Sequence, residues 1–392
     1  MKRLVTVILL VAWTLLASAV GVPAPSAAFG TGSVAAPDAR AAYLRTQRTQ
    51  VTLRLVRALL VERKLDEVKA LLEAESKRIE STVTEGALNP DDAKLLYFLG
   101  IVEEMSGAAA KRDAIFTRVR RLTPADEFTH LLLGKTFDDL HREDIAEAEY
   151  RRVLWLEPTD SGYDVEALAR LAQNAYTVRR HKQAAEFFAR LLDAIRRHTG
   201  RTYSDEAVNH FEYLHAVSLG WAAMSEPRAD NWSDALVHCE RAWKLSPDDI
   251  DAVVLGEQIA RSCLDKAKSV ELARLWRARS DRVETGLRRR INAEPHEASG
   301  HNALAWFLAE VDRGHDEAIR AAERALELEP AQPAYIDTLA ECWFKKGDAA
   351  AAVKTIRRVV DVNPWANDYY RQQLERFEAT LRKTEPERPG AP

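Results

Sequence analysis

The chain has 392 residues and a formal net charge of −4; hydrophobic residues make up 46% of it and charged residues 30%. This composition allows a large buried core together with a charged, soluble surface. A basic tract long enough to follow a phosphate backbone is missing, which argues against nucleic acid as a partner. The three cysteines are odd in number and match no zinc signature, so neither a disulfide framework nor a structural zinc site is expected.

The N-terminal segment has the form of a secretory signal peptide. Two basic residues precede an apolar run over 4–22, and small residues at 17–19 and 26–28 offer two cleavage sites. We expect residues 1–28 to be removed when the chain is exported to the periplasm or the medium. The Ala- and Arg-rich composition indicates a bacterial chain. The alternative is an uncleaved segment that anchors the chain in a membrane, because the apolar run is nearly long enough to span one.

A linker and a weaker helical region are expected next. Residues 29–40 are rich in Gly, Ala and Pro and are expected to be flexible. Residues 41–90 carry two weaker apolar stripes, over 41–63 and 65–85, which are typical of amphipathic helices. We interpret 41–90 as an N-terminal helical cap or a degenerate repeat, since arrays of repeats need a cover for an exposed end.

From residue 91 onward, a proline recurs behind the same helical pattern. Pro124 and Pro158 are 34 residues apart, and so are Pro330 and Pro364. An arginine stands six residues before each of these prolines, which confirms the register. A fixed period of about 34 residues is typical of stacked helical hairpins.

The unit that ends at Pro158 shows the physical basis of the pattern most clearly. Its first helix carries Gly134 and its second carries Ala146, and such small residues allow two antiparallel helices to approach closely. Phe137 and Tyr150 are bulky and fill the space between this pair and the next. The proline cannot continue the second helix and ends it.

This spacing resembles the tetratricopeptide repeat family, and the resemblance covers about 93–366. The first helices of the other units carry the matching pairs Leu99-Gly100, Leu171-Ala172, Leu219-Gly220, Leu255-Gly256, Ala305-Trp306 and Leu339-Ala340. The resemblance implies an all-α fold, a right-handed superhelical solenoid of stacked antiparallel helix pairs with capping helices at both ends.

The expected organisation after the cap follows from this resemblance. About seven tetratricopeptide-like units fill 91–366, a capping helix covers 367–383, and a disordered tail covers 384–392. Two regions are irregular. Extra residues at 197–212 are expected to extend a helix or form a loop, and the long unit over 249–297 is expected to contain longer helices or a bend.

Motifs for catalysis or cofactors are missing from the sequence. Phosphate-cradling glycine loops, an HExxH helix, a calcium loop and a GxSxG elbow are all absent. The closest histidine pairs are five residues apart, a spacing that does not align two ligands on one helix face. We therefore expect no catalytic residue, no metal and no cofactor. A rival reading, an enzyme that uses 249–295 as its site, lacks a nucleophile and base pair.

The resemblance also implies that the first helices line a concave groove, in which side chains four residues apart form one stripe. The stripe is aromatic and apolar at first and acidic at its end. Its candidate partner-binding residues are Tyr97, Ile101, Leu131, Lys135, Gln173, Tyr176, Trp221, Met224, Glu310, Asp337 and Glu341.

Such a groove suits an extended peptide or an amphipathic helix. The expected function is an exported, non-catalytic scaffold that binds a protein or a peptide, and the alternative is a membrane-anchored envelope assembly factor. A receptor that grips a terminal carboxylate is disfavoured, because Lys135 stands almost alone as a basic residue of the stripe. A further interpretation stays open, in which several stripe residues pack between repeats instead of facing a partner.

Overall fold

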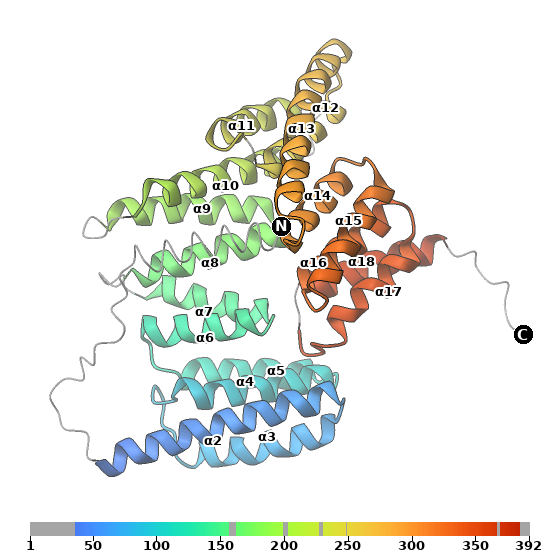
Figure 1. Ribbon diagram of the computed structural model, residues 1–392. Helices are drawn as coiled ribbons and strands as arrows, with labels where there is room; N and C mark the ends of the chain where they lie inside the picture. Colours follow the sequence, from blue (N-terminus) through green and yellow to red (C-terminus); the bar gives the residue numbers. More distant parts are fainter. Residues whose placement is uncertain are drawn as a thin grey trace, which may run out of the picture. The chain divides into compact units, whose positions relative to one another are not determined.

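The computed structural model describes residues 36–156, 162–198, 203–226, 230–247, 249–366 and 369–384. Within these ranges the chain forms seventeen α-helices, α2 to α18, and no β-strand (Figure 1). None of these helices is both long and apolar enough to cross a bilayer. The expected signal peptide, the repeat proline Pro158 and the tail after Thr384 lie outside the described residues.

Contacts divide the chain into two compact units, and each is described by itself. The N-terminal unit contains the described residues of 23–167 together with those of 360–368, and the C-terminal unit contains those of 168–359 and 369–392. The helices of the N-terminal unit are α2 (Ala36–Val61), α3 (Leu65–Glu80), α4 (Pro90–Met105), α5 (Ala109–Leu122), α6 (Glu127–Asp139) and α7 (Glu143–Trp155).

The expected linker is shorter than predicted, because α2 already begins at Ala36 and residues 36–40 are helical. Proline is tolerated in the first turn of a helix, where its missing N–H has no partner to lose, so Pro37 does not prevent this start.

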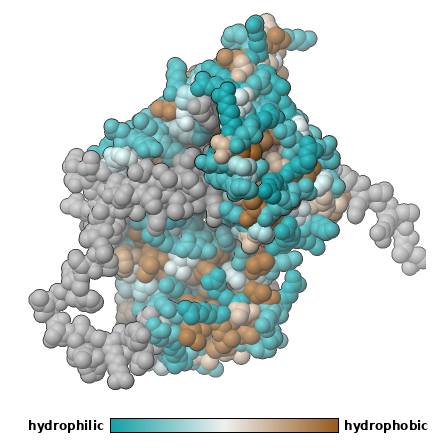
Figure 2. Space-filling view, viewed as in Figure 1, coloured by the Kyte–Doolittle hydropathy of each residue, from teal (hydrophilic) through white to brown (hydrophobic). Residues whose placement is uncertain are grey.

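Three large apolar side chains of α2 are exposed, and brown surface is visible in the region of this helix in Figure 2. They are Val51, Leu55 and Val61.

Helix starts in this unit follow from their capping residues. Asn89 accepts a hydrogen bond from the N–H of Asp92, and Pro90 occupies the first turn of α4. Asp126 accepts one from the N–H of Thr129 at the start of α6. These side chains satisfy backbone donors that have no partner within the helix.

The segment 360–366, which connects the last two helices of the chain, packs within the N-terminal unit around Arg142. The guanidinium of this buried arginine lies 2.6 Å from Asp144 and 2.8 Å from Glu104, and it donates a hydrogen bond of 3.4 Å to the carbonyl of Trp365. Arg57 lies over the Trp365 ring. Paired carboxylates offset the cost of burying the charge.

The C-terminal unit continues the series of helix pairs, and the two irregular regions are resolved as longer helices. α9 and α10 have 17 and 20 residues and α13 has 28, whereas α12, α14 and α16 have 13 each. The helices are α8 (Tyr163–Thr177), α9 (His181–Arg197), α10 (Asp205–Met224), α11 (Asn231–Leu245), α12 (Ile250–Ser262), α13 (Lys266–Ala293), α14 (Ala298–Glu310), α15 (His315–Leu328), α16 (Pro333–Lys345), α17 (Ala349–Val360) and α18 (Tyr369–Thr384).

The two helices of a pair pack along each other. The first helices of successive pairs are also in contact: α4 contacts α6 in the N-terminal unit, and in the C-terminal unit α10 contacts α12, α12 contacts α14, and α14 contacts α16. The predicted all-α array of stacked helix pairs is therefore confirmed. The final helix α18 starts at Tyr369, close to the predicted start of the C-terminal cap.

In three of the described pairs, close packing depends on a glycine that faces an aromatic ring. A Cβ atom added to Gly134 would lie 2.5 Å from Cε1 of Tyr150, and one added to Gly100 would lie closer still to Phe116. The ring thus occupies the space that any larger residue would need. The same arrangement joins Gly256 to Trp276, although α13 is the longest helix of the described chain.

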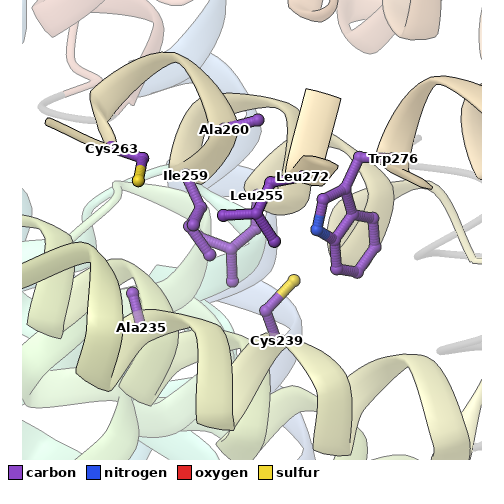
Figure 3. Close-up of a cluster of buried hydrophobic side chains, with 8 residues drawn as sticks. All are labelled: Ala235, Cys239, Leu255, Ile259, Ala260, Cys263, Leu272 and Trp276. Carbon is purple, nitrogen blue, oxygen red and sulfur yellow. The ribbon is translucent and has the colours of Figure 1, made fainter. Parts of the chain in front are cut away.

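Trp276 belongs to a buried apolar cluster that joins α11, α12 and α13 (Figure 3). Two free cysteines pack in it as small apolar residues, and burial raises the pKa of the Cys239 thiol well above its usual value. Cys263 was expected within a helix but stands just after the end of α12, as its C-cap. The cluster consists of Ala235, Cys239, Leu255, Ile259, Ala260, Cys263, Leu272 and Trp276.

The glycine contact predicts opposite effects for two Gly→Ala changes. Gly134→Ala should lower the free energy of unfolding by about 1–3 kcal/mol, because the Tyr150 ring must move. Gly286→Ala, on an exposed face of α13 with open space around it, should raise it by about 0.5–1 kcal/mol through helix propensity. Urea denaturation of both variants measures this, and equal effects would contradict the packing account.

Candidate functional site

The C-terminal unit contains a pocket on the side of its first helices. The cavity has a volume of about 140 Å³ and receives side chains from α8, α10, α12, α14 and α16, and from the capping helix α18. Five successive first helices thus contribute to one site. The lining residues are Gln173, Tyr176, Thr177, Arg179, His181, Trp221, Asp251, Val254, Trp306, Glu310, Ala334, Asp337, Thr338 and Tyr369.

Five of the eleven residues that the stripe predicted line this pocket: Gln173, Tyr176, Trp221, Glu310 and Asp337. The stripe placed the aromatic residues and the acidic ones in different parts of a groove, whereas the structure brings both kinds around a single cavity. Glu341 is buried one turn beyond Asp337, and Met224 packs against the apolar cluster of α11 to α13.

In the N-terminal unit, three of the four stripe residues are buried in the core. The Tyr97 side chain is 1% exposed, its hydroxyl donates a hydrogen bond to Glu149, and its ring contacts the edges of Phe116 and Phe137. A first-helix residue at this register faces the neighbouring pair when that pair packs closely. Lys135 is partly exposed and lies 2.8 Å from Glu166. The stripe residues buried here are Tyr97, Ile101 and Leu131.

An aromatic wall forms one side of the pocket. The Trp221 ring stacks on the His181 imidazole at 5.6 Å between centroids, and His181 meets the edge of Tyr176 at 6.1 Å. Burial, with the Arg179 charge nearby, lowers the pKa of His181 to about 4. This wall is therefore uncharged at neutral pH.

Two tyrosine–aspartate hydrogen bonds join three first helices beneath this wall. Tyr176 on α8 donates to Asp251, and Tyr213 on α10 donates to Asp249, which caps α12 and accepts the N–H of Asp251 at 3.1 Å. Burial raises the pKa of both carboxyl groups, and the Asp249 charge contributes to raising that of Asp251 to about 7. The two aspartates thus hold α8, α10 and α12 in register at the pocket.

Arg179 supplies a cation from a turn that ordinarily favours glycine. Its φ is +59°, a left-handed conformation that costs about 1–2 kcal/mol in a non-glycine residue. Arg63, His141 and Asp312 adopt it at the corresponding turns after α2, α6 and α14, and Gly107 and Gly347 do so after α4 and α16. The guanidinium lies 2.6 Å from the buried Glu310 carboxylate. The ion pair links the α8–α9 turn to α14 across the pocket.

Sequence reasoning missed several lining residues for identifiable reasons. The long unit over 249–297 was set aside as irregular, so no residue of α12 entered the stripe, although Asp251 and Val254 line the pocket. Arg179 and Tyr369 lie in a turn and in the capping helix, outside the first-helix pattern. The turn position gave no signal for Arg179, because Arg63 stands at the equivalent turn after α2 and lines no part of the pocket. Among the described residues, no group of three or more His, Cys, Asp or Glu side chains could hold a metal ion.

Solved structures similar to this chain include tetratricopeptide repeat proteins. A thermophilic one from Thermus thermophilus is 17% identical, with 55% of this chain and 98% of that chain covered and a TM-score of 0.35. Yeast Tom70 is 14% identical, with 81% and 60% covered and a TM-score of 0.34. Rap protein complexed with Competence and Sporulation Factor is 11% identical, with 86% and 100% covered and a TM-score of 0.34.

The helix pairs are tetratricopeptide-like. Their recurrence along the chain is the one that the sequence pattern predicted, whereas the Tyr150 ring, expected between this pair and the next, packs against Gly134 within its own pair. No protein-family model matches the sequence, and no curated protein matches it significantly. The properties of the pocket therefore come from its own residues.

Protonation of Asp251 predicts a specific pH dependence. An unfolded aspartate ionises near pH 3.9, and the folded one near 7, so the stability that neutral Asp251 provides is present at low pH and is lost as the pH rises from about 4 to about 7. Asp251→Asn cannot titrate. The difference in unfolding free energy between the variant and the unchanged chain should therefore shift in favour of the variant by about 1 kcal/mol or more when the pH is raised from about 5 to about 8.

Urea denaturation at both pH values measures this difference. His181 and His210 have the opposite effect, because burial lowers both pKa values to about 4 and stability is then lost as the pH falls through 6.5. Both chains contain these histidines, so their effect cancels in the comparison. Asp193→Asn, at an exposed carboxylate, is the control, and its difference in unfolding free energy from the unchanged chain should be the same at both pH values. A flat result for Asp251→Asn would mean that its carboxyl is already ionised in the folded chain.

Proposed function

We propose that the chain is an exported, non-catalytic scaffold that binds a protein or a peptide at the pocket of its C-terminal unit. The observation that carries this proposal is the convergence of five first helices and the capping helix on one cavity lined by aromatic and acidic side chains. Aromatic residues such as Trp221 and Trp306 provide large contact areas and commonly dominate the binding energy of protein interfaces.

The size of the cavity favours a side chain of a larger partner over a cofactor. Small-molecule sites commonly have volumes of about 300–1,000 Å³. The cavity here, at about 140 Å³, suits one anchoring side chain of a segment that lies along the first helices. A peptide that places one residue in the pocket would use the neighbouring surface for the rest of its contacts.

The polar groups of the pocket favour binding over catalysis. Asp249 and Asp251 accept hydrogen bonds from tyrosines and from the start of α12, which accounts for them structurally. Glu310 is held by Arg179. The Tyr176 hydroxyl donates to the Asp251 carboxylate, but burial raises the pKa of this hydroxyl well above its ordinary value, which opposes its activation as a nucleophile.

Export is proposed from the N-terminal pattern of two basic residues, an apolar run and small residues. N-terminal sequencing of the protein recovered outside the cytoplasm of a bacterial host should give a start near Val20 or Phe29. A retained Met1 in the membrane fraction would favour the alternative, a membrane-anchored envelope assembly factor.

The binding proposal predicts unequal effects for two tryptophans. A partner is first identified by pull-down from an envelope extract with mass spectrometry, and affinities are then measured by calorimetry with the purified partner. Trp221→Ala should weaken binding about tenfold or more, because loss of such an anchor commonly costs about 2 kcal/mol. Trp155→Ala, at a ring that is 77% exposed on α7 in the N-terminal unit, should leave the affinity unchanged.

Circular dichroism melts accompany these measurements, since Trp221 also packs on His181 and on the cluster of α11 to α13. If Trp221→Ala unfolds the chain, Trp306→Ala, at another lining residue, replaces it. Binding that depends on Trp155 and not on the pocket tryptophans would move the site to another surface.

A further inference from the structure

We propose that the pocket of the C-terminal unit receives the side chain of a lysine or an arginine of the partner, between its carboxylates and its aromatic rings. The inference rests on the proposed function and adds the chemical class of the anchoring residue. It is carried by three observations: the charge of the lining, the buried acceptors without donors, and a guanidinium that this chain already holds in the same way.

The lining has more acidic than basic side chains. The carboxylates of Glu310 and Asp337 line the cavity, Asp251 adds a third carboxyl whose ionised form burial disfavours, and Arg179 is the lining cation. The Glu310 side chain is 6% exposed and already pairs with Arg179, whose own side chain is 47% exposed. Charges act strongly on one another where water is largely excluded, so this excess of carboxylate attracts a cation and repels an anion.

Two buried oxygen atoms in or beside the pocket accept no hydrogen bond. Oε1 of Gln173, a lining residue, has no donor, and neither has Oε1 of Glu341 one turn beyond Asp337. The other carboxylate oxygen of Glu341 pairs with Arg376, and the Lys345 ammonium lies 4.0 Å from Oε1. Lysine and arginine side chains carry several donors and no acceptor, which is what such unpaired acceptors require.

Aromatic rings complete the arrangement. Tyr176, Trp221, Trp306 and Tyr369 line the same cavity, and the electron-rich face of such a ring attracts a cation, most strongly where water is excluded. One side of the Trp221 ring stacks on His181, which burial keeps neutral, so the imidazole adds no competing charge.

The chain contains an internal example of this recognition. The Arg279 guanidinium lies 4.2 Å from the centre of the Trp276 ring and 4.8 Å from that of Trp243. Both oxygens of Glu240 accept hydrogen bonds from it, at 2.9 and 3.1 Å. Aromatic faces with a carboxylate at the open end therefore hold a guanidinium within this same unit, and the pocket offers the same groups.

Four synthetic peptides test the inference with the purified full chain. They share one uncharged nine-residue sequence of Ala, Gly and Ser, are acetylated and amidated at their ends, and differ at the central residue, which is Arg, Lys, norleucine or Glu. Norleucine keeps the aliphatic chain of lysine without its charge. Fluorescence anisotropy with a neutral dye should show the Arg and Lys peptides binding about tenfold more tightly than the other two, which corresponds to about 1.4 kcal/mol.

Three variants assign this preference to the pocket. Asp337→Asn and Glu310→Gln should each weaken binding of the Arg peptide about fivefold or more, because each removes a lining carboxylate. Glu327→Gln, at an exposed carboxylate on α15, should leave it unchanged. Equal loss in all three variants would show general attraction to an acidic chain and would overturn the inference.

The remaining outcomes are also decisive. Equal binding of the norleucine peptide would show an apolar anchor, and tighter binding of the Glu peptide would show an anion site at Arg179. If no peptide binds at millimolar concentration while Trp221→Ala still weakens the partner, the inference fails and the proposed function stands. If Asp337→Asn weakens binding of the Arg peptide, but alanine at the pocket tryptophans leaves the affinity for the partner unchanged, the pocket chemistry stands and the proposed function fails.

Discussion

Close approach of the two helices within a pair is the contact from which this array of helices is built. An aromatic ring on the second helix fills the space left by a glycine on the first, as Tyr150 does at Gly134 and Trp276 at Gly256. The contact sets the close approach of the helices in three pairs, whereas Gly220 of α10 faces Leu255 on the next first helix. In α12 and α13 the same contact survives although the second helix has 28 residues, so extra length does not disturb the surface that the first helices form.

The pocket results from this regularity together with a few polar bonds that are particular to the chain. Each first helix brings one to three side chains to the cavity, and none of the helices could form it alone. The bonds from Tyr176 to Asp251 and from Tyr213 to Asp249 align α8, α10 and α12, while Arg179 links the α8–α9 turn to α14 through Glu310. The left-handed backbone of Arg179 recurs at Arg63, His141 and Asp312 and is a feature of the repeat turn, whereas the raised pKa of Asp251 belongs to the pocket.

Much of the fold could be predicted because its signals are local. The period of 34 residues, the small residues of the first helices and the proline stops place the helix pairs, and the capping residues Asn89 and Asp126 mark helix starts. The linker was placed wrongly at its end, since alanine and an early proline are compatible with both a linker and a helix. Five of the eleven stripe residues chosen by register line the pocket, whereas Tyr97, Ile101 and Leu131 are buried in the core.

Local sequence patterns are enough to give the class of fold, the register of the repeats and the residue types available on the first helices. Tertiary structure alone decided which of these residues meet. Residues 173 and 337 are far apart in the chain, and the turn residue Arg179 and the capping residue Tyr369 follow no repeat pattern, yet all line one cavity. The physical reason is that periodicity reports the face of a helix on which a residue lies, whereas burial or exposure of that face depends on how closely the next pair packs against it.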